Sequence, residues 1–315
     1  MSKQKLLLII GLLIFGLLFT SSVLASTQFD LRLKLKSNHS YNLKIKAVQQ
    51  VKQDFFGNQM IIKQNFISKN RYQVKRIDKQ GNYILNVYYD DLQLQLKNLG
   101  GDFGGVNEEQ FKIKYNTSMR QAAQSIEGQN FIMKISPHGE LLELKGYQKI
   151  ITYWQAEVQK YQKKNNLTGG SGIENYFDQQ FMKQLWENIL SYLPQRPVQL
   201  GNQWRSEFRL TDPLATTVVN NYTLKEVTAN KKRITTQAPI KIANLTLPQQ
   251  NIKGISYDLT GQQQGELVLN SASNWIQTGQ LKFRAQGTME VENAMIEAKL
   301  TMPVSSFINL QLHSY

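Results

Sequence analysis

The chain has 315 residues and a formal net charge of +14, with 37 Lys and Arg against 23 Asp and Glu. It contains no cysteine, which excludes disulfides, thiol catalysis, iron–sulfur clusters and Cys-ligated zinc. A chain of this length can still bury enough apolar area to be held together by its core alone. The basic excess is concentrated near the start, because residues 31–97 hold 13 Lys or Arg and four Asp.

The N-terminal residues are typical of a secretory signal peptide. Two lysines precede the 14-residue apolar run Leu6–Phe19, and permissive residues follow at Val23 and Ala25. This order predicts cleavage between Ala25 and Ser26, and an extracytoplasmic, periplasmic or secreted protein. The alternative is an uncleaved anchor, although the run is shorter than the roughly 20 residues that span a bilayer. No second run of that length follows, so the mature chain is expected to be soluble.

Residues 30–97 predict a series of antiparallel strands. Apolar and basic residues alternate in 31–46, and further alternating or β-branched stretches occupy 60–66, 82–89 and 91–97. Gly-Asn pairs at 57–58 and 81–82 are turn signals between them. The Gly-rich stretch 100–105 predicts a loop, since no strand-then-helix context or Gly-Lys-Ser/Thr accompanies it.

The basic side of this alternation needs an explanation. It consists of Arg32, Lys34, Lys36, Lys44 and Lys46. Such a row on the wet face of a sheet keeps the sheet soluble and prevents edge-to-edge pairing, which is the interpretation we favour. Nucleic-acid binding conflicts with export, so no nucleic-acid partner is expected. An anionic envelope surface is the partner that export allows.

The middle of the chain changes from strands to helices. Residues 131–146 predict a hairpin whose turn is Ser136-Pro137-His138-Gly139. Apolar residues then follow helical spacing through 147–164. A capping box at 171–174 predicts a second helix that runs to about residue 193.

After residue 204 the chain returns to strands. The predicted strands cover 204–210, 216–226, 233–237, 265–271, 278–286, 291–302 and 307–312. Strands followed by two helices and more strands predict an α+β fold, in which one large curved antiparallel sheet wraps around two central helices. The expected organisation is a signal peptide at 1–25 and a single β-rich domain at 26–315, with a helical insert at about 147–193.

No pattern predicts a catalytic, cofactor-binding or metal-ligating residue. The three histidines, His39, His138 and His313, are scattered and lack metal-ligand spacing. Adjacent carboxylates occur at 90–91 and 108–109, beside predicted turns, where solvated charges are the ordinary interpretation. Because carboxylates from distant segments can meet in a fold, an exported hydrolase that uses Asp or Glu remains the alternative.

Aromatic residues on the two predicted helices suggest another role. They are Trp154, Tyr161, Tyr176, Phe177, Phe181 and Trp186. Aromatic residues at helical spacing are most simply core residues. If the sheet curls around them incompletely, however, they would line an apolar cradle for an acyl chain or another hydrophobic ligand.

Three segments carry a resemblance to a known family. They are the hairpin ISPHGELLELKG, the stretch LPQRPVQLGNQW after the second helix, and the strand-turn-strand GELVLNSASNWIQTGQLKF. Together they resemble a family of exported bacterial β-rich proteins of unknown function, which implies an extracytoplasmic place and no catalytic residues. A weaker likeness is to the half-barrel lipoprotein carriers of the envelope, whose lipobox cysteine this chain lacks. The functional hypothesis is an exported, non-enzymatic envelope protein with a binding or structural role.

Overall fold

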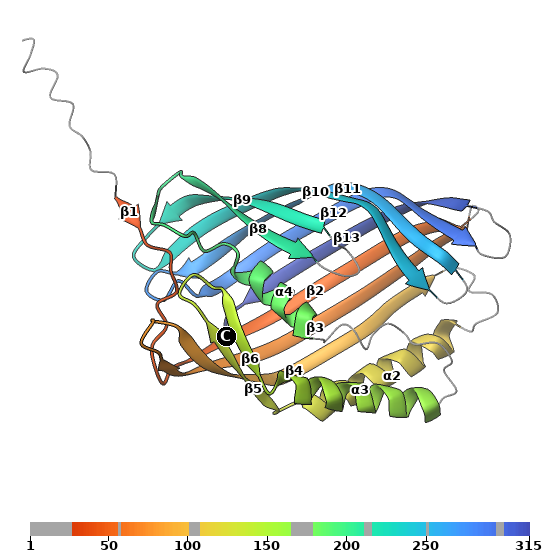
Figure 1. The fold of residues 1–315 in the computed structure, drawn as a ribbon, viewed down its shortest axis with the longest axis horizontal. Helices are drawn as coiled ribbons and strands as arrows, with labels where there is room; N and C mark the ends of the chain where they lie inside the picture. The colour runs from red at the N-terminus through yellow and green to blue at the C-terminus, as the bar shows by residue number, and fades with distance from the viewer. Residues whose placement is uncertain are drawn as a thin grey trace, which may run out of the picture.

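One curved antiparallel sheet dominates the structure (Figure 1). The computed structural model describes residues 27–55, 58–100, 108–164, 179–210, 216–249, 252–293 and 299–315. In spatial order the 11 strands are β6 (Leu141–Lys145), β5 (Asn130–Ile135), β4 (Tyr83–Gly100), β3 (Asn58–Ile77), β2 (Ser40–Phe55), β13 (Lys299–His313), β12 (Ile276–Asn293), β11 (Ile252–Asn270), β10 (Lys231–Gln249), β9 (Thr216–Val227) and β8 (Gln203–Leu210). A second, two-stranded sheet pairs β1 (Gln28–Phe29) with β7 (Val198–Gln199). The described part is therefore mostly β.

The long strands are the main difference from the predicted elements. β10 and β11 are 19 residues each, whereas the sequence predicts only 233–237 and 265–271 within them. The prediction of one strand over 291–302 is wrong, because 291–293 belong to β12 and 299–302 to β13, and these two strands pair antiparallel. Glycines inside these strands made them look shorter in the sequence than they are. Gly261 lies within β11, where a Cβ would meet the carbonyl oxygen of Arg284. Glycine at such a place marks a close approach of the neighbouring backbone rather than a turn.

The N-terminal half also has longer strands than predicted. β4 includes both 82–89 and 91–97 in one strand, apart from Asn82, with a register shift in its pairing with β3 between Lys69 and Asn70. The turn at Gly81 is present, with a φ of 83°. Of the predicted Gly-rich loop, Gly100 belongs to β4 and residues 101–105 lie outside the described residues.

The first part of the alternating stretch 31–46 is not a strand, although residues 40–46 belong to β2 as predicted. Leu31, Leu33 and Leu35 are buried, as the alternation predicts, but residues 30–39 form no sheet ladder. Instead, the amide of Leu33 donates to the carbonyl of Pro137 and that of Lys34 to the carbonyl of Ser273. The segment therefore runs past the β5–β6 and β11–β12 turns and covers one end of the curved sheet.

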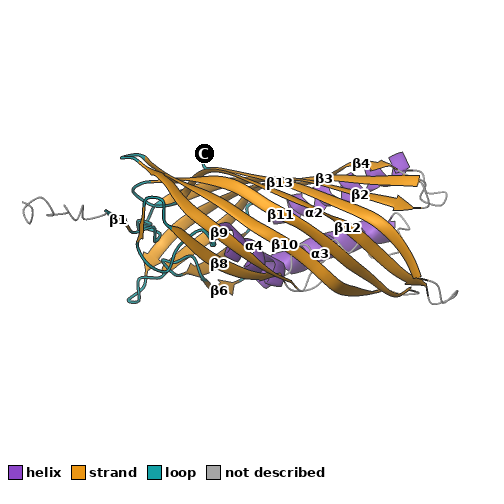
Figure 2. Ribbon diagram, turned by 90° about the horizontal axis from the view of Figure 1, so that it is seen from above, coloured by secondary structure: helices purple, strands orange, loops and turns teal. Residues whose placement is uncertain are grey.

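Three helices are described, and the arrangement of two central helices is not confirmed. α2 (Glu108–Ile126) was not predicted, because its buried side chains include Ser118, Ala122 and Ala123, which give a weak apolar period. α3 (Tyr147–Lys164) matches its predicted range, and α4 (Gln179–Leu190) lies within the second one. The capping box at 171–174 lies outside the described residues. α2 and α3 pack along β4 and β5, while α4 contacts the two edge strands, β6 and β8 (Figures 1 and 2).

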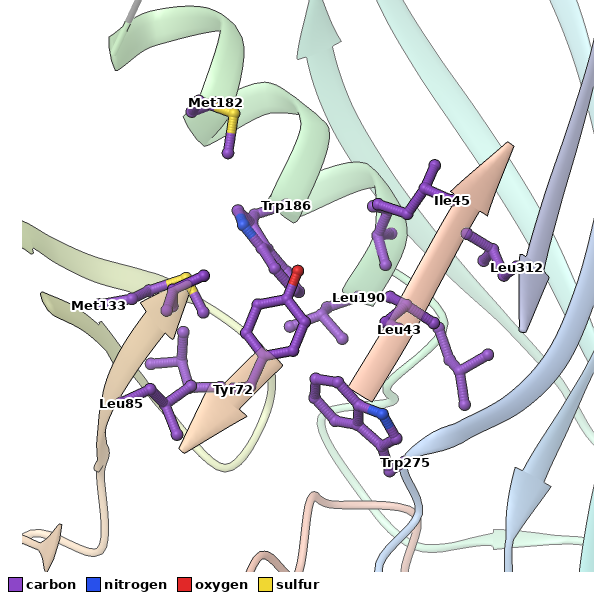
Figure 3. Close-up of a cluster of buried hydrophobic side chains, with 14 of the residues drawn as sticks. Leu43, Ile45, Tyr72, Leu85, Met133, Met182, Trp186, Leu190, Trp275 and Leu312 are labelled. Carbon is purple, nitrogen blue, oxygen red and sulfur yellow. The ribbon is translucent and has the colours of Figure 1, made fainter. Parts of the chain in front are cut away.

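The main core lies where α4 meets the inner face of the sheet (Figure 3). Trp186 of α4 packs edge-on against Tyr72 of β3, with ring centroids 4.9 Å apart. Leu43, Ile45 and Leu312 contribute from the sheet beside them. No described helix is both long and apolar enough to cross a membrane.

Candidate functional site

The inner face of the sheet carries the candidate binding surface. Cross-strand register places Leu94, Phe66, Ala47, Leu310 and Leu281 side by side on neighbouring strands. We call these five residues the inner row. All five are half-buried, in contrast to the fully buried core that Phe66, Leu94 and Leu310 border. At the strand spacing of about 4.8 Å, a row across five strands is about 19 Å long.

Two apolar clusters lie on either side of the inner row. The first is the main core around α4. The second is formed by β10–β13 alone and consists of Ile240, Ile242, Leu259, Ala285, Met289, Met302 and Val304. Half-buried Phe283 packs against this second cluster, and Ile308 is its register partner on β13. None of the described helices packs extensively against β10–β13.

The interior beside α4 is filled. A cavity of about 10 Å³ remains there, lined by Tyr72, Met182, Trp186 and neighbouring side chains. That volume is about what one water molecule requires. Trp154 and Trp186, which are 0% and 2% exposed, therefore fill the core and do not line a cradle. Tyr161 is half-buried, while Tyr176, Phe177 and the side chain of Phe181 lie outside the described residues.

A buried polar cluster follows the same inner face toward β9 and β10. The hydroxyls of Ser191 and Tyr222 are 2.5 Å apart, and the Gln263 amide donates to Asn220 Oδ1 at 3.0 Å. Burial raises the pKa of the Tyr222 hydroxyl to about 12, so it stays protonated at neutral pH. No histidine or carboxylate belongs to this cluster, so it lacks a general base.

The carboxylates at the predicted positions do not converge. Asp90 and Asp91 lie inside β4, not beside a turn, and form ion pairs with Arg71 at 3.1 Å and Lys69 at 2.9 Å. Glu108 and Glu109 occupy the first turn of α2, where negative charge stabilises a helix.

The histidines are also separated. His39 Nδ1 is 3.1 Å from the carbonyl of Ser37, and His138 Nδ1 is 3.0 Å from that of Pro194. His313 lies on β13. Within the described ranges, no three His, Cys, Asp or Glu residues are grouped as metal ligands would be.

The basic row is divided between two elements. Arg32 and Lys34 lie in the segment that covers the end of the sheet, and both approach Asp30, at 2.8 and 3.9 Å. Hydrogen bonds from Arg32 lower the pKa of Asp30 to about 2, against the opposing effect of burial. Lys44 and Lys46 lie on β2 with their side chains on the outer face. The five residues therefore do not form the single strand face that the alternation suggests. The predicted cleavage site at Ala25 and Ser26 lies outside the described residues.

Comparisons with known proteins give a family and a distant structural likeness. No curated protein matches the chain. A solved structure of lipovitellin, described as showing lipid–protein interactions, aligns with a TM-score of 0.41 and 9% identity, over 88% of this chain and 25% of lipovitellin. The chain thus spans about a quarter of that protein. The model of a family of unknown function, DUF6263, matches residues 80–276, which is more than half of the sequence. The chain belongs to this family.

Proposed function

We propose that the protein is an exported, non-enzymatic binding protein whose curved sheet holds a hydrophobic ligand on its inner face. The observation that carries this proposal is the inner row, a line of half-buried apolar side chains between two buried clusters. Apolar surface left partly open inside a concave sheet is typical of sites for hydrophobic ligands. The lining is aliphatic except for Phe66 and continues with Met60 and Ile62 farther along β3, which suits a flexible acyl chain better than a rigid polar molecule.

Export is proposed from the sequence of residues 1–25, which has the order of a signal peptide. N-terminal sequencing of the protein made in its own host tests this part. A mature N-terminus at Ser26 is expected, and a retained Met1 would contradict cleavage.

The non-enzymatic part is supported by the separation of the titratable groups. The carboxylates Asp90 and Asp91 are engaged by Arg71 and Lys69, and the buried hydroxyls of Ser191 and Tyr222 have no base beside them. No arrangement among the described residues favours the alternative, a hydrolase that uses Asp or Glu.

Native mass spectrometry and lipid extraction of protein purified from its own host test the ligand. We expect a co-purified hydrophobic molecule, and saturable binding of the fluorescent fatty acid cis-parinaric acid to the delipidated protein. Ile308→Gln should weaken that binding, because it places an amide on the inner face beside Leu310. Phe307→Gln is the matched control, since the adjacent side chain lies on the outer face.

Two results would contradict the proposal. The first is a protein that carries no lipid and shows no saturable uptake of parinaric acid. The second is equal binding by the parent, Ile308→Gln and Phe307→Gln, which would place the probe away from the inner face.

A further inference from the structure

The outer face of the sheet is hollowed as well, and this surface is separate from the inner row. Two adjoining hollows have volumes of about 870 and 670 Å³. The larger crosses β8–β12, the smaller crosses β11, β12, β13 and β2, and both include Gly261 and Gln262. We call the two together the outer groove. It crosses seven neighbouring strands, which corresponds to about 29 Å at the usual strand spacing. Figure 2 shows several of these long strands side by side.

The smaller hollow is positively charged. Its side chains are those of Gln50, Lys52, Thr260, Gln262, Arg284, Gln286, Ser305 and Phe307, with no Asp or Glu among the lining residues. Among the described residues, neither Lys52 nor Arg284 forms an ion pair. The Arg284 guanidinium lies 5.5 Å from the ring centroid of Phe307, its register partner on β13. The ring holds the cation over the hollow while leaving its donors available.

The remaining lining supplies hydrogen bonds of both kinds. Three glutamines and two hydroxyl residues stand around Lys52 and Arg284, and the larger hollow adds Gln237, Gln264 and Gln280. Amides and hydroxyls both donate and accept, which is the complement of a hydroxyl-bearing ligand. Lys225 and Lys282 extend the positive charge along the larger hollow, where Glu266 is the acidic residue.

The shape and composition distinguish among anionic partners. Single-stranded nucleic acid is normally bound by aromatic rings on which bases stack, but Phe307 is the lone aromatic lining residue and Arg284 occupies its face. A lipid headgroup surface is flat, whereas this site is an elongated hollow. A linear polymer with both hydroxyl groups and negative charges fits the length, the amides and the cations together.

We propose that the outer groove binds a linear anionic glycan. Lys52 and Arg284 recognise its negative groups, and the glutamine amides recognise its hydroxyls. The site goes beyond the proposed inner-face ligand and does not depend on it, because the two lie on opposite faces of the sheet and share only β2, β12 and β13.

The test measures binding of fluorescently labelled dextran sulfate to the full chain by anisotropy. The double variant Lys52→Gln/Arg284→Gln should weaken binding by about tenfold or more, since two charge-assisted contacts are lost. Lys163→Gln/Lys164→Gln, in the last turn of α3, removes the same charge elsewhere and should change the affinity less than about twofold. Both variants should keep the parent melting temperature, because all four side chains lie at the surface.

Three outcomes would overturn the proposal. Equal losses in the two double variants would mean that net charge alone attracts the polymer. Neutral dextran binding as tightly as dextran sulfate would remove the role of the cations. Stronger binding of an oligothymidine, or of phosphatidylglycerol vesicles, would assign the groove to nucleic acid or to a membrane surface instead.

Discussion

The two ends of the inner face are packed by different kinds of apolar side chain. At one end, α4 fills the curve of the sheet with Trp186, which packs against Tyr72. At the other end, the cluster that includes Met289 and Met302 comes from β10–β13 alone. Aromatic rings in defined geometry favour one arrangement, whereas methionine side chains adapt their shape. The comparison suggests a rigid end that maintains the fold and an adaptable end beside the inner row.

The largest effect is expected at the helix-filled end. Trp186→Ala should lower the free energy of unfolding by about 3–5 kcal/mol, because a buried aromatic is replaced by a cavity. Urea denaturation measures the change. Tyr153→Ala is the control, since that ring is 42% exposed on α3. Its loss should lower the free energy of unfolding by about 0.5 kcal/mol or less. If both variants unfold at the same urea concentration as the parent, α4 does not stabilise the curved sheet.

A smaller effect is expected at the strand-only end. Met289→Ala should cost about 2–3 kcal/mol, near the lower limit for buried Met, because neighbouring methionines can move into the space. Met289→Leu conserves volume and should cost less than about 1.5 kcal/mol. A loss from Met289→Ala as large as that from Trp186→Ala would remove the distinction between the two ends.

The free edge of β4 allows a third comparison. β5 pairs with β4 only up to Tyr88, and beyond it Asn116 of α2 exchanges two hydrogen bonds with the backbone of Leu96, at 2.7 and 3.0 Å. Asn116→Ala leaves both backbone groups unpaired and should cost about 1–2 kcal/mol in denaturant titration. Asn116→Asp keeps the acceptor for the Leu96 amide, so its free energy of unfolding should lie between those of the parent and Asn116→Ala. An alanine variant as stable as the parent would show that the two Asn116 hydrogen bonds do not stabilise this edge of β4.

The smallest effect concerns acid stability at the covering segment. The pKa of Asp30 is lowered from 3.8 to about 2 in the folded protein, so its contribution is complete above the unfolded pKa and is lost as the pH falls from about 4 to 2. Asp30→Asn should therefore reduce the melting temperature slightly at neutral pH and flatten its decline over that interval. Scanning calorimetry across the pH series checks this. If the melting temperature of Asp30→Asn falls with pH as steeply as that of the parent, other carboxylates cause the loss of stability in acid.

Much of the fold follows from local patterns in the sequence. The Ser136–Gly139 turn has the predicted geometry, with Gly139 at a φ of 83°, and α3 has the predicted helical face. Alternation also identified the buried side of Leu31, Leu33 and Leu35 correctly. It did not show that this segment lacks a strand partner, because burial alternates in any extended chain that crosses a core.

The candidate sites were less accessible to prediction because they depend on register. Leu94, Phe66 and Leu310 are distant in sequence, and only strand pairing brings them into one row. The predicted aromatic cradle assigned the lining to the helices, whose tryptophans instead fill the core. Lys282 and Arg284 form a visible alternating motif, but nothing in the sequence places Lys52 and Phe307 beside it.

The pairing of β2 with β13 has a consequence for how the molecule assembles. This pair joins the two halves of the large sheet, and it matches Gln53 with Val304 and Lys44 with His313, positions more than 250 residues apart. Hairpins on either side can form early, since their contacts are local. The pairing of β2 with β13, in contrast, must close a very long loop. Refolding is therefore expected to end in a slow step, before which β2 and β13 are both open edges. A chaperone that shields these two strands would protect the chain at its most aggregation-prone stage.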